Sequence, residues 1–136
     1  MERSLGLVTD VKDVSELLHG ARLDEVRCAP ARDGMLQLVL ELTRAVLERQ
    51  VVVRHGLWRR VRTPWTKCRV QLSRVSSLTV RHIVDLAPDG IPLLSCEAIA
   101  GGYEMTIQAP DGLQFVVTVP GLEGTFADVG TPIESP

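Results

Sequence analysis

The sequence predicts an α+β domain that is mainly antiparallel β, with a short N-terminal helix and about eight strands in a curved sheet, sandwich or partly open barrel. Residues 103–109 and 113–119 both alternate apolar and polar side chains. Between them, Pro110-Asp111-Gly112 is typical of a short hairpin turn. Further alternating runs occur between residues 22 and 84, whereas clear helical spacing occurs only at residues 10–19. A chain of 136 residues fits a single domain, which we place at residues 1–136.

The helix is predicted over residues 10–19. Asp10 is a good N-cap residue, and Gly20 suits the position just after a helix C-terminus. Apolar side chains recur on one face at Val11, Val14, Leu17 and Leu18. A helix this short needs a sheet to pack on.

Most of the β-rich region, residues 22–119, shows strand alternation. Residues 43–50 fit a helix and a strand about equally, and we favour a strand because a run of β-branched valines follows at residues 51–53. Gly56 marks a turn. The other strand runs in the first part of this region are 22–29, 35–43, 57–62, 67–75 and 78–84.

Residues 94–100 add a third strand to the hairpin at 103–119, so we expect an antiparallel meander. Segment 120–136 is rich in Gly and Pro, and we expect it to be loosely held, with one short strand around residues 125–129. The predicted core is Val14, Leu17, Leu18, Leu38, Leu40, Val70, Leu72, Ile107, Phe115 and Val117.

Composition favours a cytoplasmic protein without a membrane partner. No apolar run approaches the roughly 20 residues that span a bilayer, and the first residues lack the apolar core of a secretory signal. The three cysteines are odd in number and widely spaced, so they do not form a disulfide framework and suit a reducing compartment.

Charge is segregated along the chain. Residues 49–84 contain nine basic residues and no acidic one, whereas residues 85–136 contain eight acidic residues and no basic one. Residues 1–48 are mixed. If the basic and acidic segments pair as neighbouring strands, their charges compensate across strands or across a subunit interface.

Established catalytic motifs are absent from the sequence. It has no P-loop, no dinucleotide-binding glycine motif and no metalloprotease or serine-hydrolase signature, so we predict no cofactor. The residues with zinc-binding chemistry are His55, Cys68, His82 and Cys96. Their spacings of 13 to 14 residues match no compact ligand pair, so only the fold could assemble them into a metal or catalytic site.

The basic stretch is the one functional candidate, because it combines cations with both tryptophans of the chain. Its predicted binding residues are Trp58, Arg59, Arg60, Arg62, Trp65, Lys67 and Arg69. We interpret the protein as a non-enzymatic protein-interaction or self-associating module, such as a homodimer, that uses this region. The alternative is nucleic-acid binding through residues 54–69. A second alternative is an enzyme with a His/Cys site assembled by the fold.

Overall fold

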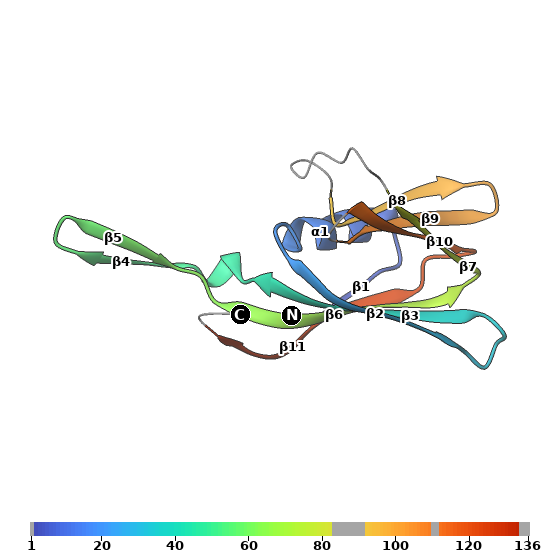
Figure 1. The fold of residues 1–136 in the computed structure, drawn as a ribbon, viewed down its shortest axis with the longest axis horizontal. Helices are drawn as coiled ribbons and strands as arrows, with labels where there is room; N and C mark the ends of the chain where they lie inside the picture. The colour runs from blue at the N-terminus through green and yellow to red at the C-terminus, as the bar shows by residue number, and fades with distance from the viewer. Residues whose placement is uncertain (1, 83–91, 110–111, 134–136) are drawn as a thin grey trace.

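The computed structural model describes residues 2–82, 92–109 and 112–133, which form a mainly antiparallel β structure with one short α-helix (Figure 1). The class predicted from the sequence is thus confirmed. The described residues contain eleven strands, where about eight were expected from the alternation pattern. Among these residues, no sheet closes on itself.

The strands form three antiparallel sheets. The five-stranded sheet has the order β1 (Glu2–Ser4), β11 (Gly124–Ile133), β6 (Trp65–Val75), β3 (Leu36–Ala45) and β2 (Arg22–Pro30). The four-stranded sheet has the order β7 (Ser77–His82), β10 (Leu113–Val119), β9 (Gly102–Gln108) and β8 (Leu94–Ile99). The third sheet is a hairpin of β4 (Val51–His55) and β5 (Trp58–Arg62).

The helix α1 (Val8–Leu17) begins two residues earlier than predicted. Leu7 precedes it, and Asp10 lies inside the first turn instead of at the N-cap. The Asp10 carboxylate accepts hydrogen bonds from the backbone N–H groups of Gly6 and Leu7, at 3.1 and 2.8 Å. It therefore stabilises the helix start from within the helix, as an acidic side chain in the first turn does.

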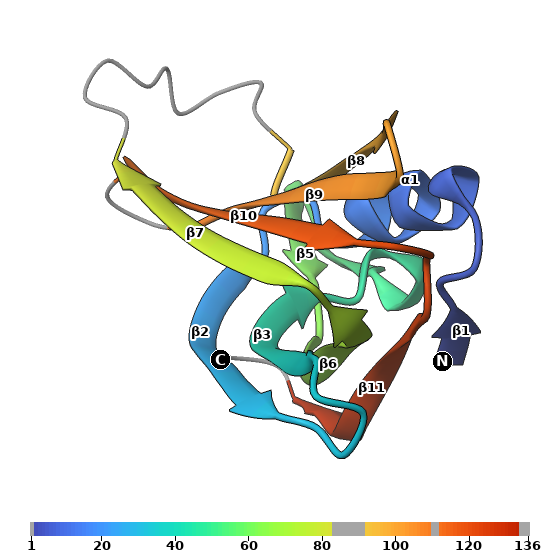
Figure 2. The ribbon, with the colours of Figure 1, turned by 90° about the vertical axis from the view of Figure 1, so that its right-hand side faces the viewer.

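The core lies between the two larger sheets and α1 (Figure 2). Eight of the ten predicted core residues are buried, and Leu17 and Phe115 are partly buried against them. At Ser76 the chain passes from β6 to β7, and so from one sheet to the other. Both the N–H and the hydroxyl of Ser76 donate to the Thr118 carbonyl, each at 2.8 Å.

Two segments differ from their predictions. In residues 43–50, β3 continues only to Ala45, and a short 3-10 helix η1 (Leu47–Arg49) follows. Segment 120–136 is not loosely held over residues 124–133, because β11 pairs with both β1 and β6. A β-carbon at Gly124 would collide with the Gln71 carbonyl, so this glycine permits close strand approach and does not signal flexibility. Phe126 on the same strand is fully buried.

Candidate interaction surface

The β4–β5 hairpin extends away from the two larger sheets (Figure 1). Gly56 and Leu57 form its two-residue turn, with Gly56 at φ 61° in the first central position, as a type II′ turn requires. The strand register pairs Val51 with Arg62, Val52 with Val61, Val53 with Arg60, Arg54 with Arg59, and His55 with Trp58. The turn predicted at Gly56 is confirmed.

Both faces of the hairpin combine apolar and cationic side chains, because residues opposite one another in an antiparallel pair share a face. One face carries Val52, Val61, Arg54 and Arg59, and the other carries Val51, Val53, Trp58, Arg60 and Arg62. All of these except the half-buried Val53 are exposed, and the Trp58 side chain is 81% exposed. Leu57 at the turn is fully exposed.

This arrangement is unfavourable for a hairpin surrounded only by water. A two-stranded hairpin without a packed face is marginally stable, and like charges directly opposite each other, here Arg54 and Arg59, are destabilising. No acidic residue occurs within residues 49–84 to offset these cations locally. The hairpin therefore combines exposed apolar side chains with cations that no acidic residue of the same segment offsets.

The structure separates the seven predicted binding residues into two groups. Trp58, Arg59, Arg60 and Arg62 belong to the hairpin, whereas Trp65, Lys67 and Arg69 lie on β6 in the five-stranded sheet. Lys67 Nζ lies 2.9 Å from Thr43 Oγ1 and 3.2 Å from Asp24 Oδ2. Arg69 Nε lies 2.7 Å from Glu41 Oε1, and Trp65 is half-buried. The β6 cations are already engaged, so the candidate surface is the hairpin.

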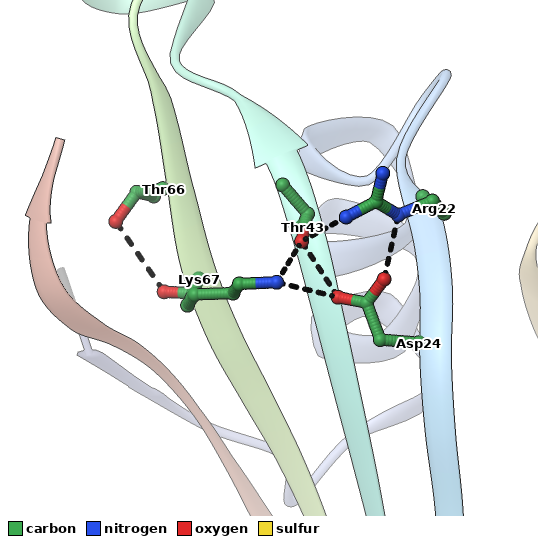
Figure 3. Close-up of polar contacts among 5 residues, drawn as sticks. All are labelled: Arg22, Asp24, Thr43, Thr66 and Lys67. Carbon is green, nitrogen blue, oxygen red and sulfur yellow. Dashed lines mark hydrogen bonds and ion pairs between the residues drawn. The ribbon is translucent and has the colours of Figure 1, made fainter. Parts of the chain in front are cut away.

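A polar cluster on this sheet, around Asp24, was not predicted from the sequence (Figure 3). Arg22 Nε donates to Asp24 Oδ1 and the Thr43 hydroxyl donates to Asp24 Oδ2, each at 2.6 Å. Burial raises the pKa of Asp24. The hydrogen bonds from Thr43, Arg22 and Lys67 together lower it by more than burial raises it, so the pKa lies below its ordinary value. The Thr66 hydroxyl contacts only the Lys67 carbonyl within this cluster, at 3.4 Å.

A threonine hydroxyl between a carboxylate and an ammonium group has the donor pattern of an activated nucleophile. Thr43 is buried, however, and its hydroxyl is occupied on both sides by Asp24 and Lys67. A cavity of about 370 Å³ lies elsewhere and does not include Thr43; its lining comes from β1, β6, β11 and the segments after β1 and before β11. The Asp24 cluster is therefore a cross-strand ladder that joins β2, β3 and β6.

A buried arginine anchors the base of the hairpin. The Arg44 side chain, 1% exposed, donates to Asp128 through Nε at 2.9 Å and through a terminal nitrogen at 2.8 Å. The same terminal nitrogen lies 2.8 Å from Glu48 in η1, and the guanidinium sits 5.9 Å from the Phe126 ring centroid. At the same place, the Val46 N–H donates to the Pro64 carbonyl at 2.8 Å. These contacts connect β3, β11 and the start of the hairpin.

The carboxylates around Arg44 have lowered pKa values. For Asp128, burial raises the pKa, but the hydrogen bonds and the charge of Arg44 outweigh burial and leave the pKa below its ordinary value. For Glu48, the hydrogen bond from Arg44 is the main cause of the lowered pKa, and burial opposes it. The guanidinium therefore stabilises the charged forms of both carboxylates.

The four His and Cys residues are not brought together. Cys68 lies in the core on β6, where burial raises its pKa to about 12. Cys96 and His82 lie on the two opposite edge strands of the four-stranded sheet, at least roughly 14 Å apart by strand spacing. His55 lies on the distant hairpin. Within the described residues, no group of three or more His, Cys, Asp or Glu side chains could hold a metal ion.

Around β6, within the described residues, the order of charge in the sequence does not decide the pairing: Lys67 and Arg69 do not pair with the acidic strand beside them. β6 does lie beside β11, but Lys67 and Arg69 pair with Asp24 and Glu41 on β2 and β3. The acidic Asp128 of β11 pairs with Arg44 of β3. Acids of residues 1–48 thus compensate Lys67 and Arg69 of β6.

No helix in the described part of the chain is long and apolar enough to cross a membrane. Comparisons of the chain with protein-family models, with curated proteins and with solved structures found no match.

Proposed function

We propose that this chain is a protein-interaction module that associates with itself, with a homodimer as its smallest assembly, and that the β4–β5 hairpin is its contact surface. The observation that carries the proposal is the exposure of Leu57, Trp58 and the hairpin valines on an extension that packs on neither larger sheet. Its free cysteines at positions 28, 68 and 96 support a reducing compartment such as the cytoplasm.

The residue types of the hairpin favour a protein partner. Trp and Arg are the residues most enriched at the energetic centres of protein interfaces, and the hairpin offers Trp58 with four arginines and no lysine. Among the described strands, β4 pairs only with β5, so the outer backbone edge of each strand has no strand partner. Such edges bind other chains by adding a strand.

Nucleic-acid binding is the second candidate, and a specific observation favours it. An arm with four arginines and a fully exposed Leu57 at its tip resembles in chemistry the arms that insert apolar wedges between base steps. Exposed valines on both faces of the hairpin favour a protein surface instead, because nucleic-acid interfaces are more polar. Lys67 and Arg69 are also engaged within the sheet, which reduces the cationic surface below that of residues 54–69.

The proposal is tested with Trp65→Phe, which leaves Trp58 as the sole tryptophan. Trp58 fluorescence and its quenching by acrylamide, a neutral quencher, are measured as the protein concentration rises, alongside light scattering after size-exclusion chromatography. We expect the measured mass to exceed that of a monomer, the Trp58 emission to shift to the blue, and quenching to fall as the assembly forms.

A matched control is Trp58→Phe, which leaves only the half-buried Trp65, whose quenching should change little with association. An assembly in which Trp58 remains fully accessible would contradict the proposal. A monomer that co-purifies with nucleic acid and releases it at high salt would favour the second candidate.

A further inference from the structure

The four-stranded sheet carries an acidic counterpart to the arginine pair of the hairpin. Glu97 on β8 and Glu104 on β9 are directly opposite each other, as Arg54 and Arg59 are on β4 and β5. Each like-charged pair is destabilising in an isolated chain. If the arginine pair contacted the glutamate pair, each would neutralise the repulsion within the other.

The surroundings of the two pairs also match. Val52 and Val61, both exposed, lie two residues from the arginine pair on the same face of the hairpin. Ile99, also exposed, lies two residues from Glu97 on the same face of β8. In each case a charged pair, with side chains about 5 Å apart, has an apolar neighbour about 7 Å along the strand.

The two pairs cannot meet within one chain. The β4–β5 tip and the β8–β9 turn point to opposite ends of the long axis of the molecule (Figure 1). Arg81, a cation on the same sheet face as Glu104, lies two strands and four residues away, roughly 16 Å by strand spacing. Among the described strands of this sheet, Arg81 is the only arginine or lysine, so the sheet itself offers the glutamate pair no nearby cation.

We propose that copies of this chain associate head to tail, with the arginine pair of one hairpin docked on the glutamate pair of the next copy. The inference rests on the proposed function and specifies the receiving surface. Charge complementarity selects this contact. Pairing hairpin with hairpin would place arginines against arginines, and pairing the two acidic surfaces would place glutamates against glutamates.

A head-to-tail contact joins two different surfaces, so each bound copy still presents one hairpin and one acidic surface. The assembly grows into a ring if the rotation between copies closes, and into an open chain if it does not. The contact also connects the segregation of charge in the sequence with assembly, because the basic segment of one copy meets the acidic segment of the next.

The test exchanges the charges on each side. R54E/R59E makes the hairpin acidic, and E97R/E104R makes the receiving surface basic. Each variant alone presents like charges at the contact, so we expect its association to be at least about tenfold weaker than that of the native chain. An equal mixture of the two, or one chain with all four substitutions, should regain association. Size-exclusion chromatography with light scattering gives the masses.

The matched control is D13R/E16R, which changes the net charge as much as E97R/E104R does but on the exposed side of α1. It should associate as the native chain does. Circular dichroism and urea unfolding establish that each variant is folded, and E97Q/E104Q, which removes the acidic charge without adding a cation, replaces E97R/E104R if that variant does not fold. E97Q/E104Q should weaken association by a smaller factor.

The possible failures are distinguishable. If Trp58 becomes covered on association but E97R/E104R associates like the native chain, the head-to-tail contact is wrong and the hairpin remains the contact surface. If Trp58 stays exposed in the assembly, both proposals are wrong. Binding of a labelled oligonucleotide by a monomer, abolished by R54E/R59E, would also overturn both and assign the arginines to nucleic acid.

Discussion

Two strands of this protein begin with a tryptophan followed by cations, and they lie in opposite environments. In β5, residues 58–62 read Trp-Arg-Arg-Val-Arg, and every side chain is exposed. In β6, residues 65–69 read Trp-Thr-Lys-Cys-Arg, and the strand lies between β3 and β11 with alternate side chains buried. Similar composition therefore leads to a projecting hairpin in one case and to the centre of a sheet in the other.

Two features account for the difference. The positions between the β6 cations are small or apolar, with Thr66, Cys68 and Val70 facing the core, whereas β5 has charges on both faces. In addition, Asp24 on β2 pairs with Lys67, and Glu41 on β3 pairs with Arg69. The role of a cationic strand is thus set by the strands beside it as much as by its own residues.

The largest effect is expected where the sheet and the hairpin join. Arg44→Ala removes the guanidinium that pairs with both Asp128 and Glu48, and removal of one partner of a buried ion pair costs about 3 to 5 kcal/mol. The free energy of unfolding in urea measures this. Arg49→Ala changes an exposed arginine of η1 and should stay within about 0.5 kcal/mol. If both variants changed the free energy of unfolding equally, the Arg44 ion pairs would not be a main source of stability.

Matched valine substitutions compare the two strands directly. Val70 on β6 is 0% exposed and Val61 on β5 is 45% exposed. Val70→Ala removes buried methyl groups and leaves a cavity, so it should lower the free energy of unfolding by about 2 kcal/mol, while Val61→Ala should change it by less than about 0.5 kcal/mol in the monomer. Thermal or urea unfolding at low protein concentration tests this. A large loss in Val61→Ala would mean that the hairpin packs on the body.

Acid should weaken the sheet before it affects the hairpin. The pKa values of Asp24, Glu48 and Asp128 are lowered in the folded state, so their stabilisation is present above the ordinary carboxyl pKa of about 4 and is lost as pH falls through the depressed values. The urea concentration at the unfolding midpoint should therefore fall as the pH is lowered from about 5 to about 2. In Arg44→Met the urea midpoint should decrease less on acidification. If it decreased as much as in the native chain, Glu48 and Asp128 would not be the groups responsible.

The smallest predicted effect is on the free energy of unfolding, which substitution of Arg69 should lower and substitution of Arg59 should not. Arg69→Gln breaks the ion pair with Glu41 and should cost about 0.2 to 1 kcal/mol. Arg59→Gln relieves repulsion with Arg54, so the free energy of unfolding should be unchanged or rise by a few tenths of a kcal/mol, roughly. Chemical unfolding of the monomer at low and high salt measures both, and the difference should shrink at high salt. A cost for Arg59→Gln equal to that for Arg69→Gln would contradict the distinction.

The sequence pattern predicted those parts of the fold in which a strand pairs with the next strand along the chain. The meander of β8, β9 and β10 was predicted because alternating runs follow one another closely in the sequence, although residues 110 and 111 of the predicted Pro110-Asp111-Gly112 turn lie outside the described residues. β11 was only partly predicted, because the glycine that permits its close approach to β6 resembles a loop signal in the sequence. β1 has three residues, too few to show a period.

Four of the seven predicted binding residues belong to the candidate surface, and the other three do not. Trp58 and the arginines of β5 stand out by composition alone. The partners of Lys67 and Arg69 lie more than twenty residues away, on β2 and β3, so the ion pairs follow from strand order and not from spacing. The Asp24 cluster likewise has no local sequence signal, because its residues come from three strands that lie apart in the sequence.

The position of β11 between β1 and β6 sets an order for folding during synthesis. Strands β7 to β10 are consecutive in the chain, so their sheet can form before β11 is available. The five-stranded sheet joins the first described strand to the last, and the edge of β6 that faces β11 stays open until β11 is made. Such an open edge is where a nascent chain pairs wrongly with its neighbours. Wrong strand pairing of this protein should therefore concentrate at the β6 edge until β11 covers it.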